Sequence, residues 1–366
     1  MQLFAELAPR TWLAFVFVFG AIWGSFLNVV IARLPEGLSV VSPPSRCPRC
    51  GKQIAWYDNL PVLSWLWLRA RCRGCALPIS ARYPLVEALT GGLALLIAVR
   101  FGPTPPALAF FVLAALLVAL AFIDLDTFWL PAVLSVPLLA LGLLSPLWNP
   151  ELGATFAAYG ILEGRPLLQA FAASASGAAL GAALLWSVGK LGSLIFRKEA
   201  MGLGDVLLLG GIGARLGVQS LFFVIMFASL QGSALGLLLL LRRRRAPPDD
   251  ERPPLPGATP DPAHAASAGG TASPPPPAIA GADIDTETDT VSVTESAAAI
   301  DLGTGTGAIT AAAAEDWEPD PHHVPFGPFL ALAALEQLLF GDQLWSAWMG
   351  MMNGLWTLID RLSGRG

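Results

Sequence analysis

Charged residues are scarce in this chain. Only 13% of its 366 residues are Asp, Glu, Lys or Arg, whereas 54% are hydrophobic. A soluble domain carries about 25% charged residues, so about half of the usual charge is missing. This shortage excludes an ordinary soluble domain, and apolar runs of about 20 residues are long enough to cross a bilayer. The sequence therefore predicts an all-α polytopic membrane protein.

Eight apolar runs are candidate transmembrane helices: 12–32, 84–99, 107–123, 131–147, 167–191, 206–217, 221–241 and 325–344. The second, fourth and sixth are short, which favours a tilted helix, a thinned bilayer or borrowed flanking residues. The first run is too long for an ordinary cleaved signal peptide. Its Gly24, Ser25 and Asn28 instead indicate packing against other helices.

The net charge of −5 is the sum of two parts of the chain that carry opposite charge. Residues 246–323 contain 14 acidic residues and one basic residue, a net of −13, and the rest contain 21 basic and 13 acidic residues, a net of +8. Basic clusters lie at 33–82, 197–198 and 242–245. With eight spans and an outside N-terminus, all three clusters fall on the cytoplasmic side, as the positive-inside rule requires. Nothing in this pattern indicates a nucleic-acid partner.

The acidic segment is predicted to be a disordered cytoplasmic linker, because it is rich in Pro, Ala, Gly, Thr and Asp and has no apolar period. Its "DLGTGTG" at 301–307 is similar to the glycine-rich loop of class I S-adenosylmethionine-dependent methyltransferases, but no strand–helix units surround it. The predicted organisation is a first span (1–33), a cytoplasmic metal-binding loop (34–82), a membrane core (83–245), the linker (246–323), and a last span with a C-terminal tail (324–366).

Cysteine is absent outside one loop. Cys47, Cys50, Cys72 and Cys75 form two C-x-x-C knuckles, "CPRCG" and "CRGCA". Four thiolates in paired knuckles are typical of a tetrahedral, structural zinc site. Two disulfides or free thiols are the alternative, and a reducing cytoplasmic side argues against disulfides.

Two aspartates lie at the ends of apolar runs on the same predicted membrane face. Asp124 comes directly after the third apolar run, and Asp205 comes directly before the sixth, after Gly202 and Gly204. Two adjacent carboxylates share one proton, so one can activate water while the other hydrogen-bonds a scissile carbonyl. This is aspartic-protease chemistry. Asp126 is the competing partner for Asp205, and we expect it to lie in the loop before Pro131.

Other interpretations of these carboxylates exist. Each aspartate alone is typical of a helix cap. An ion-coupled transporter would use Asp124, Asp205 and Glu87 as an ion path, but no inverted repeats are evident. A non-catalytic assembly factor would use the cysteine loop for docking, and it would tolerate loss of either aspartate.

Five segments together resemble the type IV prepilin leader peptidase family, bifunctional membrane enzymes of the GxGD aspartyl protease type. They are "GSFLNVVIARLP" (24–35), the cysteine loop "SRCPRC…VEALTG" (45–91), "FIDLDTFWLP" (122–131), "EAMGLGD" (199–205) and "VPFGPFLALAA" (324–334). The resemblance covers nearly the whole chain except the linker.

The resemblance implies a catalytic pair, Asp124 and Asp205, and zinc ligation by the four cysteines. It implies cleavage of the basic leader of type IV prepilins or type II secretion pseudopilins at the cytoplasmic face of the bacterial inner membrane, as part of the pilus or secretion machinery. It also implies N-methylation of the new terminus with S-adenosylmethionine. A peptidase that no longer methylates is the alternative.

Two features depart from the family pattern, and one residue is a weak cofactor candidate. Leu207 occupies the position of a usual lysine, whose loss would raise the pKa of the aspartate pair. The acidic linker is unusually long. Glu87 is the weak candidate for binding S-adenosylmethionine, although it and Asn28 are more often helix-packing groups.

Overall fold

The computed structural model describes residues 2–158, 160–197, 202–244 and 325–362. The acidic linker, with its "DLGTGTG" stretch, therefore lies outside the described residues. Within those ranges the regular secondary structure is helical, apart from two isolated bridges in the cysteine loop, and the connecting segments are turns and loops. The α-helices are α1 (Gln2–Arg33), α2 (Leu63–Trp67), α3 (Arg82–Phe101), α4 (Pro105–Thr127), α5 (Ala132–Leu144), α6 (Ala154–Ala158), α7 (Pro166–Phe196), α8 (Leu203–Leu216), α9 (Val218–Arg244) and α10 (Gly327–Leu362). Short 3₁₀ turns lie at Trp56–Asn59, Ser145–Leu147 and Pro150–Gly153.

The membrane-protein prediction is confirmed, but the number of eight spans is not. A helix occupies each of the eight predicted positions, and five of the helices in the described ranges are long and apolar enough to cross a membrane: Thr11–Arg33 of α1, α3, α4, Pro166–Ile195 of α7 and Val218–Leu241 of α9. Helices α5 and α8 have 13 and 14 residues. At about 1.5 Å per residue they reach only about 20 Å, less than a hydrocarbon core of about 30 Å.

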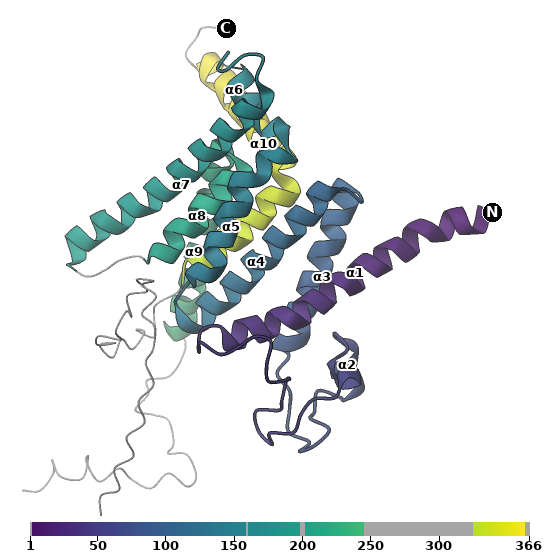
Figure 1. Ribbon diagram of the computed structural model, residues 1–366. Helices are drawn as coiled ribbons and strands as arrows, with labels where there is room; N and C mark the ends of the chain where they lie inside the picture. Colours follow the sequence, from purple (N-terminus) through teal and green to yellow (C-terminus); the bar gives the residue numbers. More distant parts are fainter. Residues whose placement is uncertain (1, 159, 198–201, 245–324, 363–366) are drawn as a thin grey trace, which may run out of the picture. The chain divides into compact units, whose positions relative to one another are not determined.

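The helices form two packed groups. Helix α1 lies along α3, and both contact α4. Helix α8 lies between α7 and α5 (Figure 1). Helix α10 packs against α4 and α8, so it joins the first group to the second.

Small residues allow the closest helix contacts. A Cβ added to Gly177 of α7 would lie 2.1 Å from the carbonyl oxygen of Gly213 in α8. A Cβ added to Gly24 of α1 would lie 2.7 Å from the Cα of Glu87 in α3, which agrees with the packing role expected of Gly24. Because lipid offers no hydrophobic driving force between helices, close backbone packing stabilises the bundle.

Candidate active site and metal centre

Asp124 lies in the last turn of α4 and is buried, with 5% of its surface exposed. Thr104 caps the start of α4, because its hydroxyl accepts a hydrogen bond from the amide of Ala107. Phe128, in the left-handed conformation, caps the other end. The amide of Gly327 donates to Oδ2 of Asp124 at 3.0 Å. Gly327 is the first residue of α10, so the Asp124 carboxylate also faces the positive end of that helix dipole.

Asp205 lies in the first turn of α8, two residues inside the helix rather than ahead of it. Gly202 precedes the helix in extended conformation, and Gly204 packs against Leu130 so closely that an added Cβ would lie 2.5 Å from the Leu130 carbonyl oxygen. The Asp205 carboxylate lies near enough to Asp124 for the two to interact electrostatically. The structure thus brings together the two carboxylates that the sequence selected.

The prediction for Asp126 was wrong. Helix α4 continues to Thr127, so Asp126 is helical and does not lie in a loop. Two residues along a helix correspond to about 200° of rotation, which turns Asp126 away from Asp124. Its carboxylate instead accepts two hydrogen bonds from Arg82 at the start of α3, at 2.7 and 2.6 Å.

Arg82 also binds the end of α4 in two further ways. Its guanidinium donates to the Phe122 carbonyl at 3.2 Å and lies 5.1 Å from the centroid of the Phe122 ring. The residues that Arg82 contacts flank Asp124 on both sides. The first residue of α3 therefore positions the turn that carries the buried carboxylate.

Two residues of this site were not selected from the sequence. Leu130 is buried and packs against Gly204. A Cβ added to Gly327 would also contact Leu130. The only sequence signal for Gly327 was its place in the "VPFG" segment, which carried no role by itself. Leu207, at the position of the usual lysine, is half-buried.

The four cysteines meet as predicted from their spacing. Their sulfur atoms all lie within 4.8 Å of one another, and the Sγ atoms of Cys47 and Cys75 are 3.9 Å apart. Tetrahedral Zn–S bonds of about 2.3 Å place sulfur atoms about 3.8 Å apart. The donor set therefore fits a zinc ion, with no ligand position left open.

The two knuckles have the same backbone turn: the amide of Gly51 donates to the Cys47 carbonyl at 2.9 Å, and the amide of Ala76 donates to the Cys72 carbonyl at the same distance. The first cysteine of each knuckle has a lowered pKa, because backbone amides donate to its sulfur, whereas desolvation and the neighbouring cysteines raise the pKa of Cys75 to about 11. Backbone amides of Cys75 and Gly74 hydrogen-bond to the Cys72 sulfur and lower the pKa of that thiol to about 6. A low thiol pKa keeps the metal-binding form populated at neutral pH.

Two buried polar side chains make contacts at this end of the bundle. The amide of Val62, in the cysteine loop, donates to Oε2 of Glu87 in α3 at 2.7 Å and so ties the loop to that helix. The side chain of Asn28 in α1 donates to the Tyr83 carbonyl in α3 at 3.1 Å and so joins the two helices. Val62 has φ of 60°, and the Leu63 amide bonds back to the Pro61 carbonyl, which makes a strained γ-turn. These contacts support packing roles for Glu87 and Asn28, and cofactor binding by Glu87 stays a prediction.

Two family models match the chain. The bacterial peptidase A24 N-terminal domain matches residues 18–101, and the type IV leader peptidase family matches residues 111–237. The first range includes all four cysteines, and the second includes Asp124 and Asp205.

Curated relatives with the name prepilin leader peptidase/N-methyltransferase match most of the chain. The Myxococcus xanthus (strain DK1622) protein is 42% identical over 331 residues, 90% of each chain. The Aeromonas hydrophila protein is 40% identical over 264 residues, 65% of this chain and 85% of that protein. The Klebsiella pneumoniae protein is 42% identical over 232 residues, 62% of this chain and 94% of that protein. No solved structure matches the chain significantly.

Proposed function

The chain belongs to the type IV leader peptidase family, and we propose that it is a membrane aspartic endopeptidase that cleaves prepilin or pseudopilin leaders and methylates the new N-terminus. Family membership sets aside the transporter and assembly-factor alternatives. The observation that carries the proposal is the placement of Asp124 at the end of α4 and of Asp205 at the start of α8, near enough to interact electrostatically, with the first residue of α10 bonded to Asp124.

In the proposed mechanism the two carboxylates share one proton. The ionised carboxylate takes a proton from a water molecule, whose oxygen attacks the scissile carbonyl, and the protonated carboxyl hydrogen-bonds the carbonyl oxygen. When the C–N bond breaks, a proton passes to the leaving amine. The products are the carboxylate of the leader and the free amine of the mature chain.

The Gly327 amide has a positioning role in this mechanism. Its bond engages Oδ2 of Asp124 and so orients the carboxylate, while the other oxygen remains for water or substrate. The bond also disperses negative charge, which helps both carboxylates to remain close together.

Two accessory groups belong to the proposal. A structural zinc ion held by Cys47, Cys50, Cys72 and Cys75 would stabilise the loop between α1 and α3. S-adenosylmethionine, when bound, supplies the methyl group for the amine that cleavage releases. We assign no residue to its binding beyond the weak candidate Glu87.

We further propose that the enzyme lies in the bacterial inner membrane with both aspartates at the cytoplasmic face. The basic clusters at 33–82, 197–198 and 242–245 support this orientation. A prepilin has a basic leader followed by an apolar helix. That helix can stay in lipid while the cleavage point reaches the aspartates, and pilus or type II secretion machinery would use the mature product.

The direct test is a processing assay with a prepilin substrate in membranes. Asp124→Asn and Asp205→Asn are expected to abolish cleavage, because each removes an ionisable carboxylate from the pair. Asp126→Asn is expected to retain most of the activity, since its side chain pairs with Arg82. The mass of the wild-type product decides between a bifunctional enzyme and a peptidase that does not methylate. Cleavage by Asp205→Asn would refute the two-carboxylate mechanism.

A further inference from the structure

A second polar cluster lies at the end of the bundle opposite to the aspartates. Arg215 follows Asp205 by ten residues on α8, and Phe110 precedes Asp124 by 14 residues on α4, which corresponds to separations of about 15 and 21 Å. Both residues line a cavity of about 510 Å³ that also touches α10. Cavities of about 300–1,000 Å³ are typical of small-molecule sites.

Arg215 is the central feature of this cavity. It is only 3% exposed, and its guanidinium lies 4.0 Å from the centroid of the Phe110 ring. Its Nε and Nη2 atoms have no hydrogen-bond acceptor among the residues that the structure describes. Burying an arginine without an anionic partner costs free energy. Such a buried, unpaired guanidinium is therefore expected to bind a ligand.

The two unsatisfied atoms form one edge of the guanidinium. Arg73 uses the same pair of atoms to bind the Asp58 carboxylate, at 2.8 Å for Nε and 2.7 Å for Nη2. This side-on geometry is the one with which arginine binds carboxylate and phosphate groups in bidentate fashion. Arg215 thus presents an anion-binding edge that nothing in the described chain occupies.

The surrounding groups favour an anion rather than a cation. Among the described residues, the indole N–H of Trp148 lacks an acceptor and lines the same cavity, and Gln337 there has an unpaired acceptor, Oε1, so the unpaired donors of Arg215 and Trp148 outnumber the unpaired acceptor. Asn149 and Thr104 add polar groups there. The one carboxylate among the lining residues, Asp342, is paired with Arg100. The cavity therefore has a net positive charge contributed by Arg215.

We propose that this cavity binds a phosphate-bearing anion, held side-on by Arg215 and by the Trp148 indole N–H. The phosphate could belong to the headgroup of an anionic phospholipid or be free inorganic phosphate. The lining favours the headgroup, because apolar side chains complete the wall: Phe101, Pro106, Phe110, Leu152, Leu216 and Leu338. This site is separate from the proposed peptidase centre.

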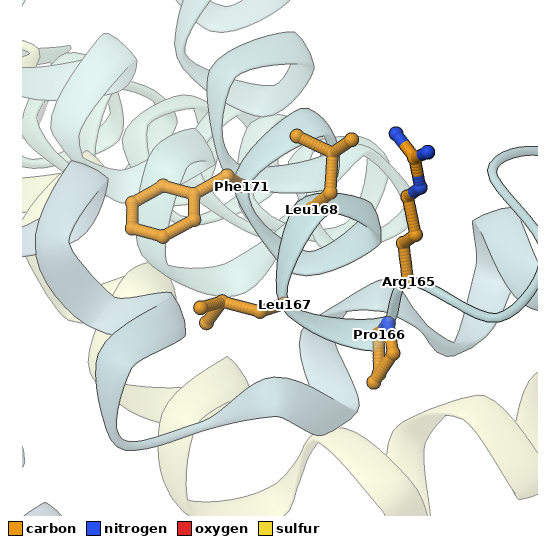
Figure 2. A pocket seen from close by; sticks show the side chains of 5 residues that line it. All are labelled: Arg165, Pro166, Leu167, Leu168 and Phe171. Carbon is orange, nitrogen blue, oxygen red and sulfur yellow. The ribbon is translucent and has the colours of Figure 1, made fainter.

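Another cavity, which shares no lining residue with the first, supplies a matched control. It has a volume of about 340 Å³ and is formed by the first turns of α7 (Figure 2). Arg165 projects away from Phe171 there and is exposed, so it has water as an alternative partner. Replacing Arg165 removes the same charge as replacing Arg215, without removing a buried guanidinium.

The test uses the full-length protein, purified and delipidated in dodecyl maltoside. Thermal unfolding and native mass spectrometry are recorded with phosphatidylglycerol, with diacylglycerol of the same chains, and with inorganic phosphate. Phosphatidylglycerol is expected to raise the Tm of the wild type and of Arg165→Met. Arg215→Met is expected to weaken binding at least about tenfold, because it removes charge-assisted hydrogen bonds. Trp148→Phe should weaken it less.

Folding failure does not obscure the result. Arg215→Met removes an unpaired buried charge, so without ligand it should unfold at or above the wild-type Tm. Trp148→Phe retains both the charge and an aromatic ring. A response to inorganic phosphate as well as lipid supports the site with free phosphate as a source, and a response to phosphatidylglycerol alone supports the lipid headgroup. Equal shifts with diacylglycerol, no shift with any probe, or unchanged binding in both variants would overturn the proposal.

Discussion

Replacing Gly327 by alanine tests the proposed positioning of Asp124. Gly327 donates its amide to Oδ2 of Asp124, and a Cβ at this residue would lie 2.4 Å from the same oxygen. It would also lie 3.4 Å from Cδ1 of Leu130. The carboxylate and the new methyl group therefore cannot keep their present positions.

The size of the effect follows from these distances. Real Cβ atoms essentially never come closer than 3.0 Å to such a neighbour, so the carboxylate or the start of α10 must move by about 0.6 Å or more. A displacement of about 1 Å at a catalytic group can lower the rate about 100-fold. Loss of the hydrogen bond to a charged group corresponds to about 1.5–3 kcal/mol. We therefore expect cleavage to fall by about 10- to 100-fold.

The assay compares kcat for a prepilin substrate in Gly327→Ala and Gly350→Ala. Gly350 lies in the same helix, and a Cβ there meets nothing within 4 Å. Gly350→Ala should leave kcat unchanged and stabilise α10 by up to about 1 kcal/mol, because alanine favours helix more than glycine. Thermal unfolding of both variants verifies that the bundle remains folded.

The reasoning would be refuted if a folded Gly327→Ala variant cleaved within about threefold of the wild type. In that case the hydrogen bond from α10 would not orient the reacting carboxylate. A loss of activity in both glycine variants would instead indicate a general requirement for glycine in α10.

Three further predictions concern the loop and its junction with the helices. A double-mutant cycle of Arg82→Met and Asp126→Asn should give a coupling of about 0.5–1 kcal/mol in thermal unfolding, since both side chains are about one-third exposed. Ala76→Gly should stabilise the metal loop by up to about 1 kcal/mol, because Ala76 has φ of 56° and glycine adopts that conformation without strain. Elemental analysis should find one zinc ion per chain, and Cys72→Ser should lose most of it.

Each of these predictions has a contrary result. Additive effects of the two ion-pair substitutions would show that Arg82 and Asp126 are not coupled. Ala55→Gly is the control for Ala76→Gly, because φ of Ala55 is −70° and glycine should destabilise there. If both substitutions changed the stability equally, the left-handed backbone at Ala76 would not be the cause of the effect. A Cys72→Ser variant with full zinc content would exclude a four-cysteine site.

Local patterns in the sequence predicted much of the fold. Apolar runs placed a helix at each expected position, because a helix depends mainly on neighbouring residues and on the bilayer. The predicted lengths were less accurate: α10 runs to Leu362, far beyond the predicted end at residue 344. Asp126 was misplaced because nothing near it in the sequence marks where α4 ends. Arg82, which binds it, is 44 residues away.

The sequence by itself determined the helical membrane class, the paired cysteine knuckles and the family, because each depends on residue types at short spacing. The tertiary structure alone decided what surrounds the two aspartates that the sequence selected. The backbone amide that donates to the Asp124 carboxylate belongs to Gly327, 203 residues further along the chain. Leu130 packs against Gly204 only because α4, α5 and α8 converge. The same holds for Arg215, whose unpaired edge depends on what the other helices leave beside it. Such contacts join segments far apart in sequence, and only the packing of whole helices brings them together.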